Sequence, residues 1–126
     1  MDERFEVFVA NVNSMQSVYS GWGIKQRCFA ARIVGAALWY LGKTGPKKKG
    51  FTVHHKSPRT KAAFELLVGK PLSVEEFGAR FSSTYNVTEE IPTDAHNKIK
   101  RYRPTKNDWE TQTEKDSQNR TELSCI

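Results

Sequence analysis

With 126 residues, the chain is long enough for one domain with a modest core and too short for two. Hydrophobic residues make up 37% of it, the mean hydropathy is −0.65 and aromatic residues reach 11%, so we expect a folded core beside a highly exposed or unfolded part. The formal net charge of +6 at pH 7 favours an anionic partner.

The sequence carries no sign of export or membrane insertion. The opening stretch, MDERFEVFVA, has acidic residues and no apolar h-region, so it does not resemble a secretory signal. The most apolar run, residues 28–42, is interrupted by Arg32 and is shorter than the roughly twenty residues of a bilayer span. Cys28 and Cys125 do not resemble a disulfide framework. We expect an intracellular protein, in the cytoplasm or nucleus, without an integral membrane segment.

Two helices are predicted at the start of the chain. From Asp2 to Tyr19, apolar residues recur at spacings of three and four, which indicates one stripe of an amphipathic helix. Gly21 and Gly23 then interrupt the pattern. A second helix is predicted from Ile24 to Leu41, and its apolar character and small residues make it the expected central helix of the domain.

A third helix is predicted after a glycine-rich connection. FTV, residues 51–53, fits either a short strand or an extended loop. Ser57-Pro58 is typical of a helix start, with Pro58 in the first helical position. This helix would reach about Val68 before Gly69 ends it.

A fourth and a fifth helix complete the predicted domain. Ser73, followed three residues later by Glu76, forms a capping-box pattern at the start of the fourth helix. Thr93 is expected to cap a short fifth helix that ends before Pro104.

The predicted fold class is therefore all-α. We expect a small four- to five-helix bundle around a central apolar helix in residues 1–103. Residues 104–126 are polar, lack periodicity and carry more acidic than basic side chains, which predicts a disordered acidic tail.

Positive charge gathers in two clusters. Between Lys43 and Lys70 there are eight basic residues and one acidic residue, Glu65. KIKRYR, residues 98–103, adds four basic residues and a tyrosine. Such clusters on a small domain are typical of proteins that bind the phosphate backbone of a nucleic acid. The candidate binding residues are Lys43, Lys47, Lys48, Lys49, Lys56, Arg59, Lys61, Lys98, Lys100, Arg101, Tyr102 and Arg103.

The residue types in these clusters favour contact with backbone over reading of bases. Lysine predominates in residues 42–61, and it acts as a point charge rather than a bidentate fork. Tyr102 could stack on an unpaired base. His54 and His55 would extend the positive surface when they are protonated, below about pH 6.5.

Catalytic and metal sites are less well supported. His54 and His55 would point to opposite faces of an extended segment, and no motif supplies further ligands, so we expect no metal. Cys28 falls on the apolar face of a predicted core helix, where a thiol is inert. GKTGPKKKG lacks the spacing of a phosphate-binding loop. We expect no enzyme activity and no cofactor.

Two further patterns remain as alternatives. PKKK, residues 46–49, resembles the core of a basic nuclear-import segment. Residues 72–102 have some features of a helix-turn-helix, but the polar gap around Pro92 makes the connection longer than that motif allows.

The sequence thus favours a small non-enzymatic protein that binds RNA or DNA, and a nucleocapsid-like or viral accessory role would fit. The alternative is a helical assembly or adaptor subunit, with self-association or a protein partner, whose basic loop binds an acidic protein or an anionic membrane surface. The alternative predicts that association is lost when apolar surface residues such as Trp22 or Trp39 are removed.

Overall fold

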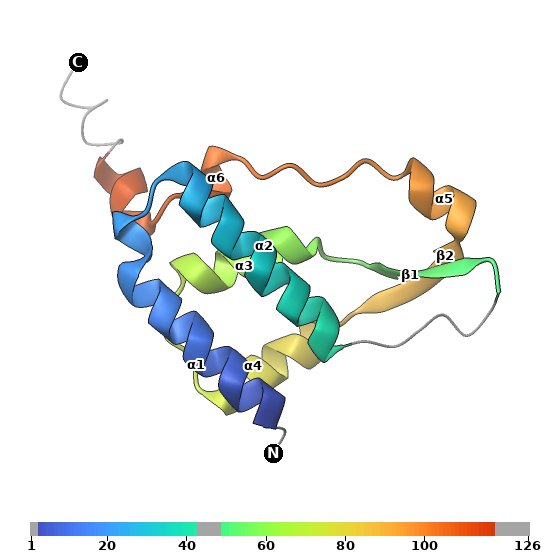
Figure 1. Cartoon of the computed structure of the whole chain (residues 1–126), viewed down its shortest axis with the longest axis horizontal. Coiled ribbons are helices and arrows are strands. Elements are labelled where there is room, and N and C mark those ends of the chain that lie inside the picture. Colours follow the sequence, from blue (N-terminus) through green and yellow to red (C-terminus); the bar gives the residue numbers. More distant parts are fainter. Residues whose placement is uncertain (1–2, 43–48, 118–126) are drawn as a thin grey trace.

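The computed structural model describes residues 3–42 and 49–117, and it is mostly helical with one small sheet (Figure 1). In chain order the elements are α1 (Glu3–Val18), a 3₁₀ turn η1 (Tyr19–Gly21), α2 (Ile24–Leu41), β1 (Phe51–His55), α3 (Arg59–Val68), α4 (Val74–Arg80), a π-helical turn η2 (Phe81–Tyr85), β2 (Thr88–Pro92), α5 (Thr93–Lys98) and α6 (Lys106–Trp109). Residues 112–117 are also helical. The predicted helical character is confirmed in outline.

Local signals in the sequence account for several helix boundaries. Helix α2 begins after Gly23, whose backbone N–H donates to the side chain of Gln26, and it has the predicted bounds. Helix α4 begins after Ser73, whose hydroxyl oxygen accepts a hydrogen bond from the backbone N–H of Glu76 at 3.1 Å. Pro58 precedes α3 as its N-cap rather than occupying the first helical position.

The core is formed where α1 and α2 pack against α3, and α4 packs against α1. Helix α3 contributes most to it, because Phe64, Leu66 and Leu67 are almost completely buried. From α4, Phe77 is fully buried and packs edge-on against Phe5 of α1, with ring centroids 5.4 Å apart. The most enclosed helix is thus α3, whereas the sequence predicted α2 as the central one.

Helix α2 buries its small residues and exposes large ones. Ala30, Ala31 and Gly35 are buried, and Gly35 lies close to the backbone of Arg59 at the start of α3. Phe29 and Tyr40 fall on the outer surface and are 66% and 61% exposed. Small residues at the contact allow close helix packing, with Val34 and Leu38 buried beside them, whereas Phe29 and Tyr40 lie on the opposite side of α2.

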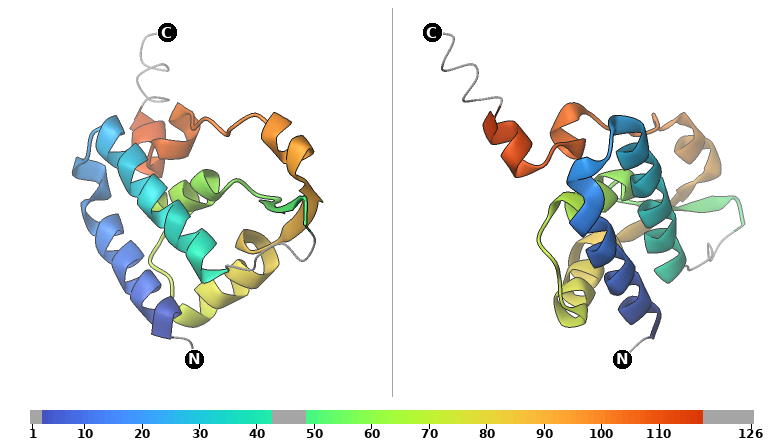
Figure 2. Two further views of the ribbon diagram at one scale, coloured as in Figure 1. Left: turned by 45° about the vertical axis from the view of Figure 1, so that its right-hand side comes forward. Right: turned by 60° about the vertical axis from the view of Figure 1, so that its left-hand side comes forward.

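The sequence predicted only part of the two-stranded antiparallel sheet. Strand β1 lies where the sequence allowed a strand or a loop, and it pairs with β2 in the register Phe51 to Pro92 through His55 to Thr88. Strand β2 occupies the polar gap, for which no strand was predicted, and it separates α4 from α5. The tight helix-turn-helix considered for residues 72–102 is therefore excluded. Figures 1 and 2 show the sheet and α5 at the end of the molecule farthest from α1.

The predicted disordered tail is wrong for residues 104–117. Helix α6 follows Thr105, and Arg27 of α2 forms an ion pair with Glu114 at 2.7 Å. Tyr19 donates a hydrogen bond to the backbone carbonyl of Trp109 at 2.6 Å. These contacts hold the segment against the ends of α1 and α2, so the ordered structure extends beyond the predicted boundary at residue 103. Residues 118–126 lie outside the described part.

None of the helices in residues 3–42 and 49–117 combines the length and hydrophobicity needed to span a bilayer.

Candidate polyanion-binding face

The sheet brings parts of both predicted basic clusters to one end of the molecule. The backbone N–H of Thr93, the first residue of α5, donates to the carbonyl of Gly50 at 2.9 Å, which places Lys49 beside the start of α5. The rings of His54 and His96 lie 5.7 Å apart, so α5 packs against β1. The chain after α5 then carries the KIKRYR cluster away from the sheet. Segments distant in sequence thus meet around the sheet and α5.

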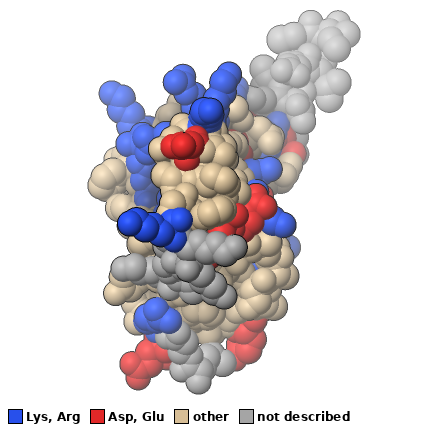
Figure 3. Space-filling view, turned by 90° about the vertical axis from the view of Figure 1, so that its right-hand side faces the viewer, with Lys and Arg blue, Asp and Glu red and all other residues tan. Residues whose placement is uncertain are grey.

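We define the basic face as the exposed cations around β1, β2, α5 and the segment that follows α5. Its members are Lys49, Lys56, Lys98, Lys100, Arg101 and Arg103, and all of them are exposed. Figure 3 shows Lys and Arg side chains gathered over the upper part of this end.

Carboxylates lie among these cations. Glu89 and Glu90 are exposed on β2, and Asp94 is exposed in the first turn of α5. In the register of the sheet, Glu89 faces His54 and Glu90 faces Val53. The basic face therefore has a smaller positive charge than the two sequence clusters suggest in isolation.

Arg59 and Lys61 belong to α3 and are not part of the basic face as defined, although Arg59 lies near His55 of β1. The guanidinium carbon of Arg59 lies 6.0 Å from the centre of the Trp39 ring, and burial lowers the pKa of Arg59. Lys61 is exposed two positions after Arg59, on the other side of the same helix. The remaining candidates, Lys43, Lys47 and Lys48, lie outside the described residues.

Tyr102 anchors the KIKRYR segment. Its hydroxyl donates a hydrogen bond to the carboxylate of Asp108 at 2.6 Å, and the same carboxylate accepts from the backbone N–H of Thr105. Burial together with this hydrogen bond raises the pKa of Tyr102 to about 12. Because the side chain is partly buried and its hydroxyl is occupied, only part of the ring is left for the predicted stacking on a base.

The neighbouring histidines differ in environment. His54 packs edge-on against His96, whereas His55 is half-buried and approaches Arg59. Burial, then the positive charge of Arg59, lowers the pKa of His55. The predicted gain of positive charge near pH 6.5 therefore does not extend to His55. Among residues 3–42 and 49–117, no group of His, Cys, Asp and Glu side chains is arranged to hold a metal ion.

The sequence did not predict the polar cluster that holds the C-terminal segment. Arg27 is only 4% exposed, and its guanidinium lies 4.6 Å from the centre of the Tyr19 ring. It donates to both carboxylate oxygens of Glu114, at 2.7 and 3.0 Å, and to the carbonyl of Trp109 at 3.0 Å. Arg27 falls one turn before Ala30 and Ala31 on the buried stripe of α2, and a cation in that position indicates a buried anionic partner.

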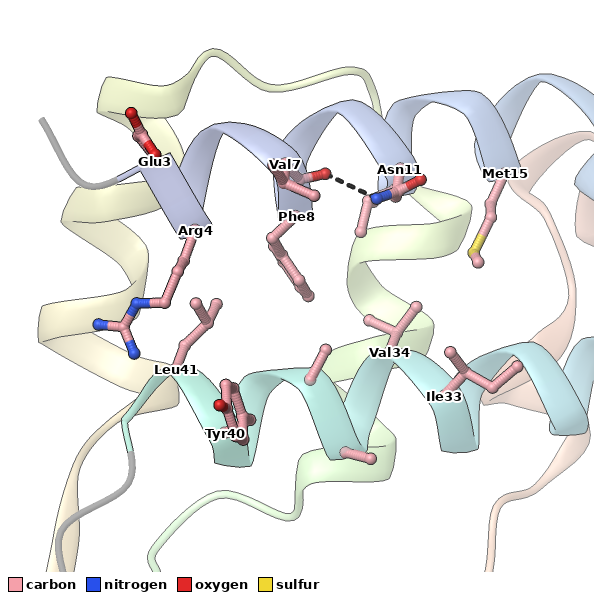
Figure 4. A pocket seen from close by; sticks show the side chains of 13 residues that line it. Glu3, Arg4, Val7, Phe8, Asn11, Met15, Ile33, Val34, Tyr40 and Leu41 are labelled. Atoms are coloured by element: carbon pink, nitrogen blue, oxygen red, sulfur yellow. Dashed lines mark hydrogen bonds between the residues drawn. The ribbon is translucent and has the colours of Figure 1, made fainter.

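A separate apolar groove of about 790 Å³ runs between α1 and α2 (Figure 4). Phe8 points into it from α1, and Ile33 and Tyr40 line it from α2. Asn11 is among its polar residues, and its side-chain amide donates to the carbonyl of Val7 at 2.9 Å. The groove thus offers mostly apolar contacts.

Comparisons of the chain with protein-family models, with curated proteins and with solved structures gave no match, so the functional assignment depends on the residues and geometry described above.

Proposed function

We propose that the protein is a non-enzymatic nucleic-acid-binding protein that contacts the phosphate backbone of RNA or DNA through the basic face. The observation that carries this proposal is the packing of β1 with β2 and α5, which brings Lys49 and Lys56 to the same end of the molecule as Lys98, where the KIKRYR segment begins. Without this packing, the two charge clusters, which are some fifty positions apart in the sequence, would contact phosphates independently of each other.

The geometry suits a strand of phosphates better than a compact anion. The cations are exposed and spread from the two ends of β1 over α5 and along residues 99–103, instead of converging on one point. Exposed lysine and arginine side chains neutralise phosphates and release counterions, which gives affinity without base-specific contacts. Glu89, Glu90 and Asp94 would repel part of the backbone, so we expect moderate affinity with a strong dependence on salt.

Binding is tested by a salt titration with a single-stranded RNA of about 30 nucleotides, starting near 50 mM salt. We expect log Kd to rise linearly with log salt concentration. Lys100→Glu should weaken binding at low salt and reduce the slope by about 0.7 or more, because one phosphate contact is lost. Lys70→Glu is the matched control: Lys70 is also exposed, but it follows α3 near Gln16 of α1.

Two outcomes would contradict the proposal. One is the absence of binding to RNA and to DNA at low salt. The other is an equal loss of affinity in Lys100→Glu and Lys70→Glu, which would show that net charge rather than the basic face determines binding. Binding to vesicles that contain an anionic phospholipid, together with failure to bind RNA, would support the membrane alternative instead.

A further inference from the structure

The outer face of α2 carries a continuous apolar stripe. Phe29, Ile33, Ala36 and Tyr40 are separated by four, three and four positions, so they lie on one side of the helix. Phe29, Ile33 and Tyr40 are 66%, 46% and 61% exposed. These residues form a ridge on the protein surface, with the small side chain of Ala36 as a dip within it. We call this set the α2 ridge.

The groove lies directly beside the α2 ridge. Ile33, Ala36 and Tyr40 belong both to the ridge and to the wall of the groove, while Val7 and Met15 line the groove from α1. Figure 4 shows the two helices running alongside each other with the apolar side chains between and below them. A protruding apolar helix face and a recess between two helices therefore lie side by side on one surface.

This arrangement is self-complementary. In a two-fold dimer the same patch on each copy contacts the other, so a patch must contain both the shape that inserts and the shape that receives. With the axis next to α2, the α2 ridge of each copy enters the groove between α1 and α2 of its partner. Ala36, between Ile33 and Tyr40, allows the two α2 helices to approach closely at their crossing, at the separation of about 8–10 Å that is usual for packed helices.

The amount of apolar surface fits such a dimer. Aromatic side chains have about 150–250 Å² of surface each, so the exposed parts of Phe29 and Tyr40 contribute roughly 250 Å². Ile33 and Val7, 46% and 60% exposed, raise the total to roughly 400 Å² per copy. A standard interface buries about 800 Å² per partner, of which somewhat more than half is non-polar. The patch supplies about that apolar share.

We propose that the face formed by α1 and α2 is a homodimer interface, in which the α2 ridge of one copy occupies the groove of a second copy. This inference is independent of the proposed nucleic-acid binding, because no residue of the basic face belongs to α1 or α2. A small apolar ligand fits the groove less well. Specific ligand sites combine apolar walls with a few convergent polar groups. Here the amide of Asn11 already donates to Val7 within α1, and the charged residues Glu3 and Arg4 come from the first turn of that helix, at one end of the groove.

Dimerisation is tested by sedimentation equilibrium of the full-length chain from about 1 to about 300 µM, because dimer formation depends on protomer concentration. Samples are freed of nucleic acid with nuclease and high salt, and the ratio of absorbance at 260 and 280 nm is checked. We expect a reversible monomer–dimer equilibrium. Ile33→Asp should raise the dimer Kd by about 30-fold or more, because a charge at the centre of an interface removes a principal contact.

Ile99→Asp is the matched control. Ile99 is 48% exposed, close to the 46% of Ile33, but it follows α5 at the sheet end. This control should leave the dimer Kd unchanged, and unchanged circular dichroism would show that both variants remain folded.

A second measurement tests the two-fold geometry. Ala36→Cys, in a background with Cys28→Ser and Cys125→Ser, should form a disulfide-linked dimer on mild oxidation, since the axis brings the two copies of residue 36 together. Ser17→Cys, an exposed position of α1 outside the groove, should not.

Three results would overturn the proposal: a monomer throughout the concentration range, a dimer that Ile33→Asp leaves intact, or equal weakening by the Ile99→Asp control. If the protein is a monomer and Ile33→Asp also lowers its Tm, another part of the same chain covers the groove.

Discussion

The ion pair between Arg27 and Glu114 holds the C-terminal segment on the helical core, and Glu114→Gln tests how strongly. The guanidinium contacts both carboxylate oxygens, at 2.7 and 3.0 Å. It also donates to the carbonyls of Ser20 and Trp109, and it lies over the ring of Tyr19. The substitution preserves the shape of the side chain. It removes the negative charge, which leaves a buried cation paired only with carbonyls and an aromatic ring.

The expected loss of stability is about 2 kcal/mol. Removing one partner of a fully buried ion pair costs about 3–5 kcal/mol, and hydrogen bonds to charged groups contribute about 1.5–3 kcal/mol each. The Arg27 side chain is 5% exposed but that of Glu114 is 38% exposed, so water screens part of the interaction and the lower end of these values applies. For a domain of this size, 2 kcal/mol corresponds to a fall in Tm of roughly 8 °C.

Urea denaturation at pH 7, followed by tryptophan fluorescence and circular dichroism, measures the difference in unfolding free energy. Asp116→Asn is the control, because this carboxylate lies in the same segment, is exposed and accepts a hydrogen bond only from the side chain of Gln112 among the hydrogen bonds described. It should change stability by less than about 0.5 kcal/mol. If Glu114→Gln had an equally small effect, the ion pair would not hold the segment and the reasoning would be refuted.

The same pair predicts a dependence on pH. The hydrogen bond from Arg27 lowers the pKa of Glu114 from its ordinary value of 4.5. The stabilisation is therefore complete above that value and is lost as the pH falls through the lower pKa of the folded state. The stability difference between the wild type and Glu114→Gln should accordingly shrink in acid. A difference that stayed constant would mean that charge is not its cause.

Two further substitutions test local features. Gly50 has φ of 85°, a backbone conformation that residues with a Cβ rarely adopt, so Gly50→Ala should destabilise the protein by about 1–2 kcal/mol. Gly78 lies in α4 with open space around it, so Gly78→Ala should stabilise the protein by about 0.5–1 kcal/mol. Equal effects of the two substitutions in urea denaturation would contradict this explanation. Burial lowers the pKa of His55 below 6.5, so the unfolded state takes up this proton first and stability should decline as the pH falls from 6.5 toward the folded pKa. His55→Gln should flatten that decline, and an unchanged pH profile would show that His55 does not cause it.

Helix positions could be predicted well where the signals are local. The apolar pattern and flanking glycines predicted Ile24–Leu41, and Ser73 with Glu76 predicted the start of α4. Strand β2 was missed because its alternation is short and acidic, and because its pairing depends on β1, far away in the sequence. The end of α5 at Lys98 was also missed, since the fifth helix was predicted to continue to Tyr102, before Pro104.

The C-terminal segment was missed for a different reason. Composition correctly describes residues 104–117 as polar, but a few contacts are enough to order a polar segment. Trp109 packs against the core, and Glu114 pairs with Arg27. The sequence did contain a signal, namely an arginine in the buried stripe of α2. The groove between α1 and α2 could not be predicted, because periodicity shows that α2 is apolar without showing which side the core leaves uncovered.

The sheet end and the helical core differ in how firmly they are held. Every residue of β1 is only half-buried, and α5 contributes no buried residue, whereas α3 carries several side chains that are almost fully enclosed. Local opening costs least where few apolar contacts must be broken. We therefore expect the strands and α5 to open locally at lower cost than the core. If the proposed binding holds, part of the basic face would therefore sit on the segment that opens most easily, and a bound strand could shift it without breaking the hydrophobic core.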